Sequence, residues 1–362
     1  MIVVAKIGSS SLTDESGHID DACIRKLCAE VAEVRGAGRQ VVIVTSGAIA
    51  AGQPALGLDS ARPTKVTTLQ AISAVGQSRL MRAYDRALAD HDLIGGQVLL
   101  SPLDLIDHNQ YGRARKTMRR LLELGVVPVV NENDAVADDE IRMGDNDRLA
   151  ALVAQLVGAD LLVLLTDTAG LHTGDPRLVE GASLIEEVVE VDHELEALAG
   201  RRGTARGSGG MLTKLQAAKM ASWSGVRTVI AAAARADVLV DAVAGVPGVG
   251  TVVRAHGRRL PARKLWIAFA VGSSGTVVVD DGARRALVER NTSLLPAGVV
   301  RVEGAFAAGD AVEIATADGT VVAKGLVRHP SSQVEQWRGR RTADLPTDMP
   351  REVVHRDDLV VL

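Results

Sequence analysis

A lysine stands inside the first apolar run of the chain, and a turn of small residues follows it directly. The run reads IVVAKI over residues 2–7, with Lys6 near its end, and Gly8 and the serines 9–11 come next. A buried ammonium group is costly without a counterion, so Lys6 either faces an anionic ligand at the end of a strand or extends its head to solvent. A glycine-containing turn at the end of a strand exposes backbone N–H groups, as phosphate-binding turns of open α/β sheets do. The turn favours phosphate, while both alternatives for Lys6 stay open.

A second turn of small residues, RGSGG over residues 206–210, opens a stretch with helical spacing, MLTKLQAAKMA. Thr213 and Lys214 lie in the first turn of this predicted helix. Glycines let the backbone approach a phosphate closely, the helix N-terminus contributes partial positive charge, and Lys214 adds a full one. The spacing is neither that of a GxxxxGKS/T loop nor that of a GxGxxG dinucleotide loop. The alternative is a surface linker, which the turn alone does not exclude.

Acidic and amide side chains gather after another apolar run, VVPVV. The polar residues are Asn131, Glu132, Asn133, Asp134, Asp138, Asp139, Glu140, Asp145, Asn146 and Asp147. Such groups suit three roles: oxygen ligands of Mg²⁺ or Ca²⁺, a grip for the ammonium of an amino acid, or solvated loop and helix-capping residues. Their spacing does not match the EF-hand loop. For Asp145 the capping role is favoured, because a helix follows it.

Polar residues follow two further apolar runs, at Thr45 and Ser46 and at Thr166 and Asp167. Ligands of an open α/β sheet bind outside the carboxyl ends of its strands, so several such clusters predict one shared site. No GxSxG pattern surrounds Ser46, and the eight histidines show no zinc pattern. Two lysines, two glycine-rich turns and an acidic cluster therefore indicate phosphoryl transfer. A carboxylate acceptor, with a pKa of about 4.3, is already ionised and needs no histidine base.

The elements that must position these residues alternate along the first two thirds of the chain. Apolar runs predict buried strands over residues 2–7, 40–45, 95–100, 125–130, 160–166 and 227–232, covered on both faces. Amphipathic stretches predict helices over residues 20–38, 65–90, 109–124 and 145–157. The pattern predicts a three-layer α/β/α sandwich with a mainly parallel sheet over residues 1–255.

The remaining third of the chain follows a different pattern. A basic, irregular stretch predicts a linker over residues 256–265. Short alternating strands with glycine turns then predict a small, mostly β domain over residues 266–362. With 362 residues, two domains are the expected number.

Composition narrows the class of protein. The formal charge is −4, so the chain lacks the basic field of nucleic-acid binders, and the substrate is expected to be small. No apolar run approaches the roughly 18 residues of a membrane helix, and the first residues do not form an export signal. Cys23 and Cys28 fit neither CxxC chemistry nor a metal cluster and are expected in the core. We therefore expect a soluble protein of the reducing cytoplasm.

Seven stretches of the sequence resemble signatures of the glutamate 5-kinase family, within the amino-acid kinase superfamily. They read AKIGSSSLT, IVTSGAIAAG, VVPVVNENDAV, MGDND, LLTDTAGLHTGDPR, GSGGMLTKLQAA and HRDDLV, in the order of the family and over essentially the whole length. Residues from about 266 to 350 resemble a PUA domain. The resemblance implies MgATP-dependent transfer of a phosphoryl group to the side-chain carboxylate of L-glutamate, the first step toward proline.

The resemblance also implies roles for individual residues. Lys6 and Lys214 neutralise charge on the transferring phosphoryl group, Asp147 orients both lysines, and Ser46, Asp134 and Asn146 bind glutamate. The implied ATP-binding residues are Lys6, Gly8, Ser9, Thr166, Asp167, Ser208, Gly209, Gly210, Met211, Leu212, Thr213 and Lys214. Mg²⁺ bridges phosphate oxygens and keeps mostly water, so no protein ligand is named for it. Ser9 stands where a threonine is common and Leu212 where a serine is common, and neither change removes a charge or a glycine.

Some alternatives stay open. Proline inhibition and a homo-oligomer, a dimer or tetramer, are common in the family, and the sequence only permits them. A kinase of the same fold could take N-acetylglutamate, aspartate or a nucleotide monophosphate. RNA binding by the second domain is disfavoured, because residues 266–362 carry 11 Lys and Arg against 13 Asp and Glu. Its best candidate patch is Arg338, Arg340 and Arg341 beside Trp337.

Overall fold

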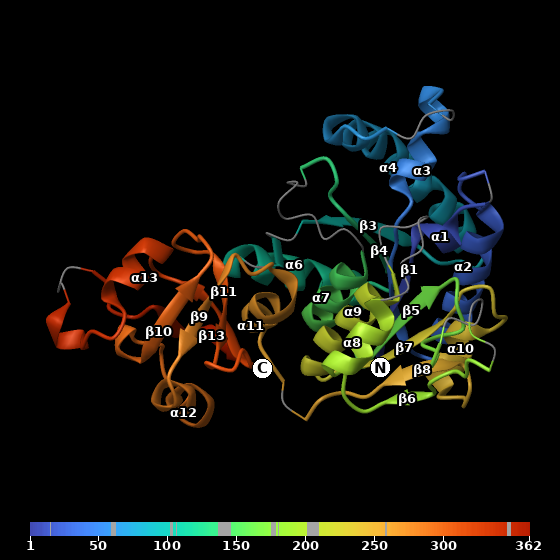
Figure 1. Ribbon diagram of the computed structural model, residues 1–362. Coiled ribbons are helices and arrows are strands. Elements are labelled where there is room, and N and C mark those ends of the chain that lie inside the picture. The colour runs from blue at the N-terminus through green and yellow to red at the C-terminus, as the bar shows by residue number, and fades with distance from the viewer. Residues whose placement is uncertain are drawn as a thin grey trace. The chain divides into compact units, whose positions relative to one another are not determined.

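The computed structural model describes the chain except residues 15, 59–62, 102–103, 106, 137–145, 175–178, 180, 201–209, 258 and 346–348. The chain divides into two compact units, Met1–Arg259 and Leu260–Leu362 (Figure 1). The segment for which a linker was expected, 256–265, contains this division. Its last four residues form a short helix, α11 (Ala262–Leu265).

An eight-stranded sheet forms the centre of the first unit, with the strand order β3-β4-β2-β1-β5-β7-β8-β6. The strands are β1 (Ile2–Ile7), β2 (Gln40–Val44), β3 (Gly95–Leu100), β4 (Val127–Glu132), β5 (Leu161–Thr166), β6 (Glu187–Val188), β7 (Arg227–Ala232) and β8 (Gly250–Val253). Every neighbouring pair is parallel except β7 and β8, which are antiparallel. The mainly parallel sheet predicted from the apolar runs is confirmed.

Two of the six predicted strands differ clearly from the prediction. β3 is not covered on both faces: only its last residue, Leu100, is buried, because β3 pairs with β4 alone at the edge of the sheet. β4 begins two residues later than expected and extends through Asn131 and Glu132, which pair with Leu99 and Leu100 of β3. These two polar residues therefore belong to the strand itself, and both are buried.

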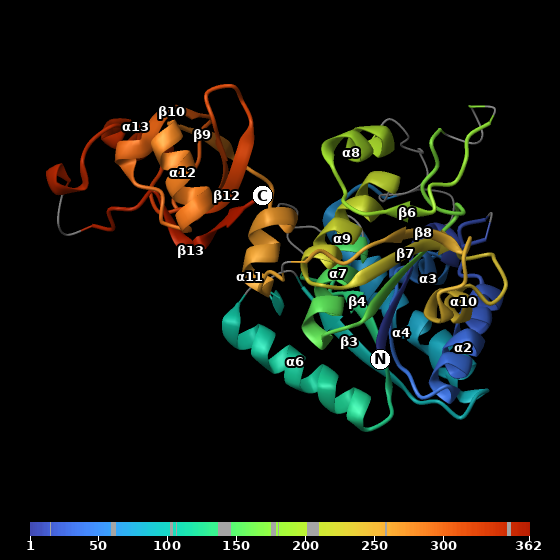
Figure 2. The same ribbon diagram turned by 90° about the horizontal axis from the view of Figure 1, so that it is seen from below.

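Helices cover both faces of this sheet, as Figure 2 shows. One layer contains α2 (Asp21–Gly36), α3 (Ala48–Gly52), α4 (Val66–Ala89) and α10 (Val238–Ala244). The other contains α6 (His108–Glu123), α7 (Asn146–Val157), α8 (His193–Gly200) and α9 (Met211–Trp223). Val3, Ala5 and Ile7 of β1 join the core formed with α2, α4 and α10. Because side chains alternate along a strand, Lys6 faces the α7 and α9 side. The three-layer sandwich is confirmed.

Local sequence explains how α2 and α3 are placed. Asp20 caps α2 by accepting from the backbone N–H of Ala22 and of Cys23, at 2.8 and 3.3 Å. α3 packs directly on α4 through glycines: a Cβ added at Gly76 would lie 1.7 Å from a carbonyl oxygen of α3, and one at Gly52 would lie 2.1 Å from a carbonyl oxygen of α4. Only glycine permits this approach, which fixes the helix that follows Ser46.

The second unit is a small, mostly β structure, as predicted. Its sheet has the order β10-β9-β11-β12-β13, with β9 and β11 parallel and the other pairs antiparallel. The strands are β9 (Gly275–Val279), β10 (Val299–Glu303), β11 (Ala311–Ala315), β12 (Val321–Val327) and β13 (Val354–Val361). Two helices were not predicted from the sequence, α12 (Asp281–Arg290) and α13 (Ser331–Trp337). None of the helices in the described part of the chain has the length and apolar composition that a membrane span requires.

Candidate active site

Three charged side chains meet at the carboxyl end of β1. Lys6 lies next to the end of that strand, Asp147 in the first turn of α7 and Lys214 in the first turn of α9. Nζ of Lys6 is 2.5 Å from Oδ1 of Asp147, and Nζ of Lys214 is 3.1 Å from Oδ2 of the same carboxylate. Lys6 is 1% exposed, Asp147 0% and Lys214 7%. The structure excludes one alternative for Lys6, because its ammonium does not reach solvent. The partner that the structure shows is the carboxylate of Asp147.

This cluster is suited to an anion. Two ammonium groups contact the same buried carboxylate, so these three side chains together carry a net positive charge. Gly210 precedes α9 as its N-cap and provides no side-chain cap, and the first turn of α9 has no acidic residue, so the helix dipole adds to the positive potential. The hydroxyl of Thr213 lies 2.8 Å from the carbonyl oxygen of Gly210 and 3.3 Å from Oδ2 of Asp147. A phosphate group fits both the sign of this charge and the exposed start of the helix.

The turn after β1 lies beside the first ammonium. Gly8 precedes a four-residue helix, α1 (Ser9–Leu12), which has no side-chain cap. A Cβ at Gly8 would lie 3.2 Å from Nζ of Lys6, so a larger residue there would crowd the ammonium. Ser9 is exposed at the start of this turn, and its carbonyl oxygen accepts from the hydroxyl of Thr13 at 2.9 Å.

A network of side-chain amides lies next to Asp147, around Asn146 at the start of α7. Nδ2 of Asn146 lies 2.5 Å from the carbonyl oxygen of Thr45, 3.1 Å from Oγ of Ser46 and 2.8 Å from Oδ1 of Asn131. Nδ2 of Asn131 in turn donates to Oε1 of Gln77 at 2.8 Å. These bonds connect the carboxyl ends of β2 and β4 to α7, so Ser46 and Asn146 belong to one cluster next to the lysines.

Asp134 is held from α4. Oδ2 of Asp134 accepts a hydrogen bond from the hydroxyl of Ser73 at 2.6 Å, and the aspartate itself is half-buried. Its carboxylate therefore has a fixed position while part of it remains accessible. This combination suits a group that receives a cationic part of a ligand.

The remaining predicted ATP-binding residues divide between described and undescribed parts of the chain. Thr166 ends β5, the neighbour of β1, and its hydroxyl donates to Oδ1 of Asp167 at 3.0 Å. Met211 and Leu212 are half-buried in the first turn of α9. Ser208 and Gly209 lie outside the described residues.

Part of the acidic cluster also lies outside the described residues, namely Asp138, Asp139, Glu140 and Asp145. In the described parts of the chain, no group of three or more His, Cys, Asp or Glu is placed to hold a metal ion. Both oxygens of Asp147 face lysines, which leaves this carboxylate poorly suited to ligate Mg²⁺ directly.

Sequence reasoning missed Ser73 and Gln77, which hold Asp134 and Asn131 in place. The sequence carried part of a signal: the two polar residues are four apart, so they lie on one face of the predicted helix. The structure adds that both are buried. A buried polar pair at helical spacing indicates a partner across the interface.

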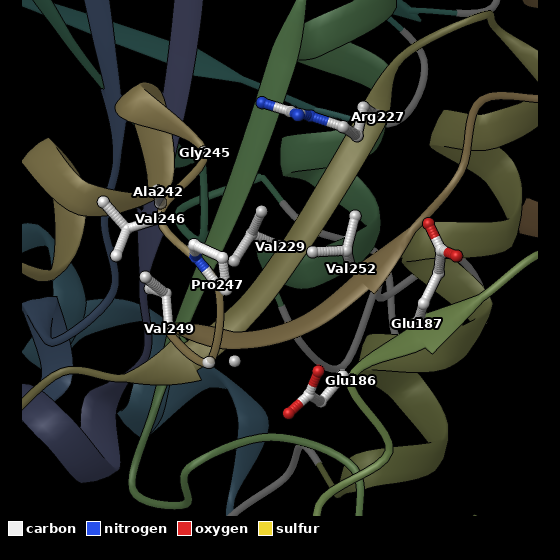
Figure 3. Close-up of a pocket in the computed structure, with 12 residues that line it drawn as sticks. Glu186, Glu187, Arg227, Val229, Ala242, Gly245, Val246, Pro247, Val249 and Val252 are labelled. Atoms are coloured by element: carbon white, nitrogen blue, oxygen red, sulfur yellow. The ribbon is translucent and has the colours of Figure 1, made fainter.

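A cavity of about 250 Å³ lies elsewhere in this unit, on β7, β8 and α10. Figure 3 shows Val229, Pro247, Val249 and Val252 between the side chains of Arg227 and Glu186. None of the predicted site residues lines it. This hollow therefore has no part in the candidate active site.

The basic patch of the second unit lacks an exposed aromatic platform. Trp337 is buried, and its ring packs edge-on against His329 with the centroids 4.7 Å apart. Arg338 pairs with Glu335 at 2.9 Å. The only aromatic residue of the predicted patch is thus part of the core of this unit and is not available to stack on a base.

Comparisons with known proteins place the chain in a class of kinases, a class with which a buried cluster of two lysines agrees. The sequence profile described as "Amino acid kinase family" matches residues 1–232, and the profile of the "PUA domain" matches residues 275–347. A solved structure titled "Carbamate kinase from Giardia lamblia bound to AMP-PNP" shares the fold, with a TM-score of 0.50 and 18% identity, over 70% of this chain and 98% of that chain.

Similar proteins extend over the whole chain. The "Glutamate 5-kinase" of Thermobifida fusca (strain YX) is 47% identical over 370 residues, which are 99% of this chain and 93% of the relative. The "Glutamate 5-kinase" of Geobacter sp. (strain M21) is 45% identical over 364 residues, which are 99% of this chain and 97% of the relative. The chain belongs to the amino acid kinase family and, within it, to the glutamate 5-kinases.

Proposed function

We propose that the protein transfers the γ-phosphoryl group of ATP to the side-chain carboxylate of L-glutamate, giving L-glutamyl 5-phosphate and ADP. The observation that carries this proposal is the buried cluster in which Asp147 holds the ammonium groups of Lys6 and Lys214 together. The name shared by the full-length relatives supplies the acceptor.

The chemistry asks for charge neutralisation and little else. An oxygen of the glutamate side-chain carboxylate attacks the γ-phosphorus, a new P–O bond forms, and the bond to the bridging oxygen of the β-phosphate breaks. The acceptor is already ionised at neutral pH, since its pKa is about 4.3, so no base has to remove a proton. Negative charge develops on the transferring group and on the leaving oxygen, where Lys6 and Lys214 stabilise it. Asp147 is the residue that orients both lysines.

The ATP site is proposed to follow the two turns at the carboxyl edge of the sheet. Gly8 and Ser9 form one turn, and Ser208, Gly209, Gly210, Met211, Leu212 and Thr213 lead into the helix that carries Lys214. Thr166 ends the neighbouring strand, Asp167 follows it, and both are proposed to face the nucleotide. Mg²⁺ would neutralise phosphate charge, coordinated mainly by phosphate oxygens and water.

L-Glutamate is proposed to bind at Ser46, Asp134 and Asn146. The carboxylate of Asp134 and the side-chain oxygen Oδ1 of Asn146 are acceptors, so they suit the α-ammonium group of the substrate. The Ser46 hydroxyl is able to donate to a carboxylate oxygen. An amino acid carries both kinds of group, which agrees with the mixture of acceptors and donors at this end of α7.

The pathway, the regulation, the domain boundaries and the oligomeric state are proposed from the sequence and the family resemblance. The product is an acyl phosphate, and the reaction is the first step of proline biosynthesis in the cytoplasm, with L-proline as a feedback inhibitor that overlaps the glutamate site. We propose residues 1–255 as the kinase domain, 256–265 as a linker and 266–362 as the PUA-like domain with the C-terminal tail. A homo-oligomer, a dimer or tetramer, completes the proposal.

Trapping the acyl phosphate tests the reaction directly. The protein is incubated with MgATP, L-glutamate and hydroxylamine, and the hydroxamate is measured, with aspartate and N-acetylglutamate in parallel reactions. Hydroxamate with glutamate alone is the expected result. Hydroxamate with another acid alone would keep the chemistry and refute the acceptor, and no hydroxamate with any acid would refute the kinase assignment.

A further inference from the structure

One buried polar side chain beside the site has no part in the proposed reaction. Gln77 lies on α4, is 8% exposed, and accepts from Nδ2 of Asn131 through its Oε1 at 2.8 Å. We propose that Gln77 is a positioning residue of the glutamate site: it fixes the Asn131 amide and, through it, the amide of Asn146. This inference rests on the proposed function.

Two backbone groups set the direction of the amide chain. The backbone N–H of Glu132 is able only to donate, and it points to Oδ1 of Asn131 at 2.9 Å. The Asn131 NH₂ group must then face the other way, toward Oε1 of Gln77. The carbonyl oxygen of Thr45 is able only to accept, and it lies 2.5 Å from Nδ2 of Asn146. Each amide is therefore fixed in one of its two orientations.

The orientation of Asn146 decides what it offers to a ligand. Its NH₂ group is engaged by the Thr45 carbonyl and by Oδ1 of Asn131, so the remaining polar atom is the acceptor Oδ1. An acceptor attracts the ammonium group of an amino acid, whereas an NH₂ group in the same place would repel it. The amide chain thus selects the amino group of the substrate.

Gln77 stabilises this orientation from the closed end of the chain. Asn131 is 2% exposed, and Oε1 of Gln77 is the acceptor that the described residues provide for its NH₂ group. Without that acceptor, the NH₂ group would be a buried donor that has lost this bond. Asn131 could then satisfy that group only by turning away from Glu132, which would take Oδ1 away from Asn146. Asn146 would be free to turn its NH₂ group toward the substrate.

Only the oxygen of Gln77 is used in this arrangement. Nε2 of Gln77 is buried and makes no hydrogen bond to any of the residues that the structure describes. A side chain that keeps an oxygen at this place should therefore preserve the function, and one of the same length without an oxygen should not. Glutamate and methionine at residue 77 make this comparison, and Gln97→Met makes the same change at an exposed position on β3.

The test measures kcat and the KM values for L-glutamate and ATP by hydroxamate formation, together with the thermal midpoint of each variant. We expect Gln77→Met to raise the KM for L-glutamate by about tenfold, with kcat and the KM for ATP within about twofold of the wild type. Gln77→Glu is expected within about threefold of the wild type in all three constants, and Gln97→Met unchanged. A folded Gln77→Met protein with a normal KM for L-glutamate would overturn the inference.

A double variant tests whether Gln77 acts through Asn131. In an Asn131→Ala background, adding Gln77→Met should not raise the KM for L-glutamate further, whereas additive effects would mean that Gln77 acts by another route. Should Gln77→Met not fold, Asn131→Leu tests the same link: it should raise the KM for L-glutamate, and a normal KM would overturn the inference. Absence of glutamate-dependent activity in the wild type would instead refute the proposed function.

Discussion

Replacing Asp147 by asparagine should lower the stability of the first unit by a large amount while keeping its shape. The carboxylate is fully buried and lies within 3.1 Å of the ammonium groups of both Lys6 and Lys214. Asparagine fills the same volume and carries no charge. The two ammonium groups would then remain buried beside each other with no counterion between them.

The size of the effect follows from the burial of all three groups. Removing one partner of a buried ion pair costs about 3–5 kcal/mol, because an uncompensated charge is left behind. For a unit of this size, each kcal/mol shifts the thermal midpoint by roughly 2–3 °C. The Asp147→Asn protein should therefore unfold roughly 6–15 °C below the wild type in buffer without nucleotide.

Nucleotide should reverse much of this loss, which separates the electrostatic explanation from a packing defect. Phosphate groups bound at the two lysines supply the missing negative charge, and a ligand at about 100 times its Kd adds about 2.7 kcal/mol to the stability. We expect MgATP to raise the thermal midpoint of Asp147→Asn more than that of the wild type. The assay is differential scanning calorimetry of both proteins with and without MgATP.

An exposed pair on the same unit provides the matched control. Arg120 and Glu123 of α6 are 3.1 Å apart with both side chains mostly exposed, so Glu123→Gln should shift the midpoint by less than about 3 °C. An Asp147→Asn protein as stable as the wild type without nucleotide would refute the counterion role. A large loss that MgATP does not reduce would refute the account of the lysines as a phosphate site.

Three further predictions concern catalysis, packing and reactivity. Lys214→Ala should lower kcat by roughly 10²- to 10³-fold and change the KM for L-glutamate by less than about threefold, because the charge of the lysine matters most in the transition state. A variant that lost only affinity for L-glutamate would contradict this role. Gly76→Ala should destabilise the first unit by at least about 2 kcal/mol in urea unfolding, because its Cβ would lie 1.7 Å from a carbonyl oxygen of α3. Gly112→Ala on α6 is the control: its Cβ would lie in open space, so the change should be neutral or stabilising by up to about 1 kcal/mol. Burial raises the pKa of the Cys28 thiol to about 12 and also raises the pKa of the Cys23 thiol, so both thiols stay protonated at about pH 8. Iodoacetamide should therefore label the half-buried Cys23 slowly and the buried Cys28 only after unfolding, which mass spectrometry can follow.

The layers of the fold could be predicted because local patterns determine them. The apolar runs at residues 2–7 and 160–166 became adjacent buried strands, and their flanking helices start where the caps indicate, as at Asp20. The position of each strand in the sheet is not a local property. Residues 95–100 end in the apolar residues Val98, Leu99 and Leu100, which resemble a central run, yet β3 is an edge strand, and its exposure depends on the strand order.

The second unit illustrates why short helices are not predicted from hydrophobic periodicity. α12 has only ten residues and one fully buried side chain, Leu287, so its apolar pattern is too short to distinguish it from a turn between strands. The cap at Asp280, which accepts from the backbone N–H of Ala283 at 2.7 Å, was the available signal.

In the candidate site, too, some residues could be predicted from local sequence, whereas the contacts between them could not. Lys6 and Lys214 were identifiable because a charge inside an apolar run and a charge after a glycine turn both need an explanation at the level of the sequence. Only the family resemblance implied that one carboxylate, Asp147, joins them. The residue pattern alone could not give this contact, because the three residues come from elements far apart in the chain. Gln77 was missed for a related reason: its partner Asn131 lies 54 residues away, on a strand that ends two residues later than expected.

The start of α7 connects the two halves of the site. Asn146 and Asp147 are consecutive, so on a helix with 3.6 residues per turn their side chains diverge by about 100°. Asn146 points to the amides and to Ser46, while Asp147 points to the two lysines. In the proposed site, a displacement of α7 would therefore move together the group that orients the acceptor and the group that orients the two lysines. The spacing between acceptor and donor is thus set within one rigid turn of helix, and changes elsewhere in the unit should alter the affinity for each substrate more readily than the alignment between them.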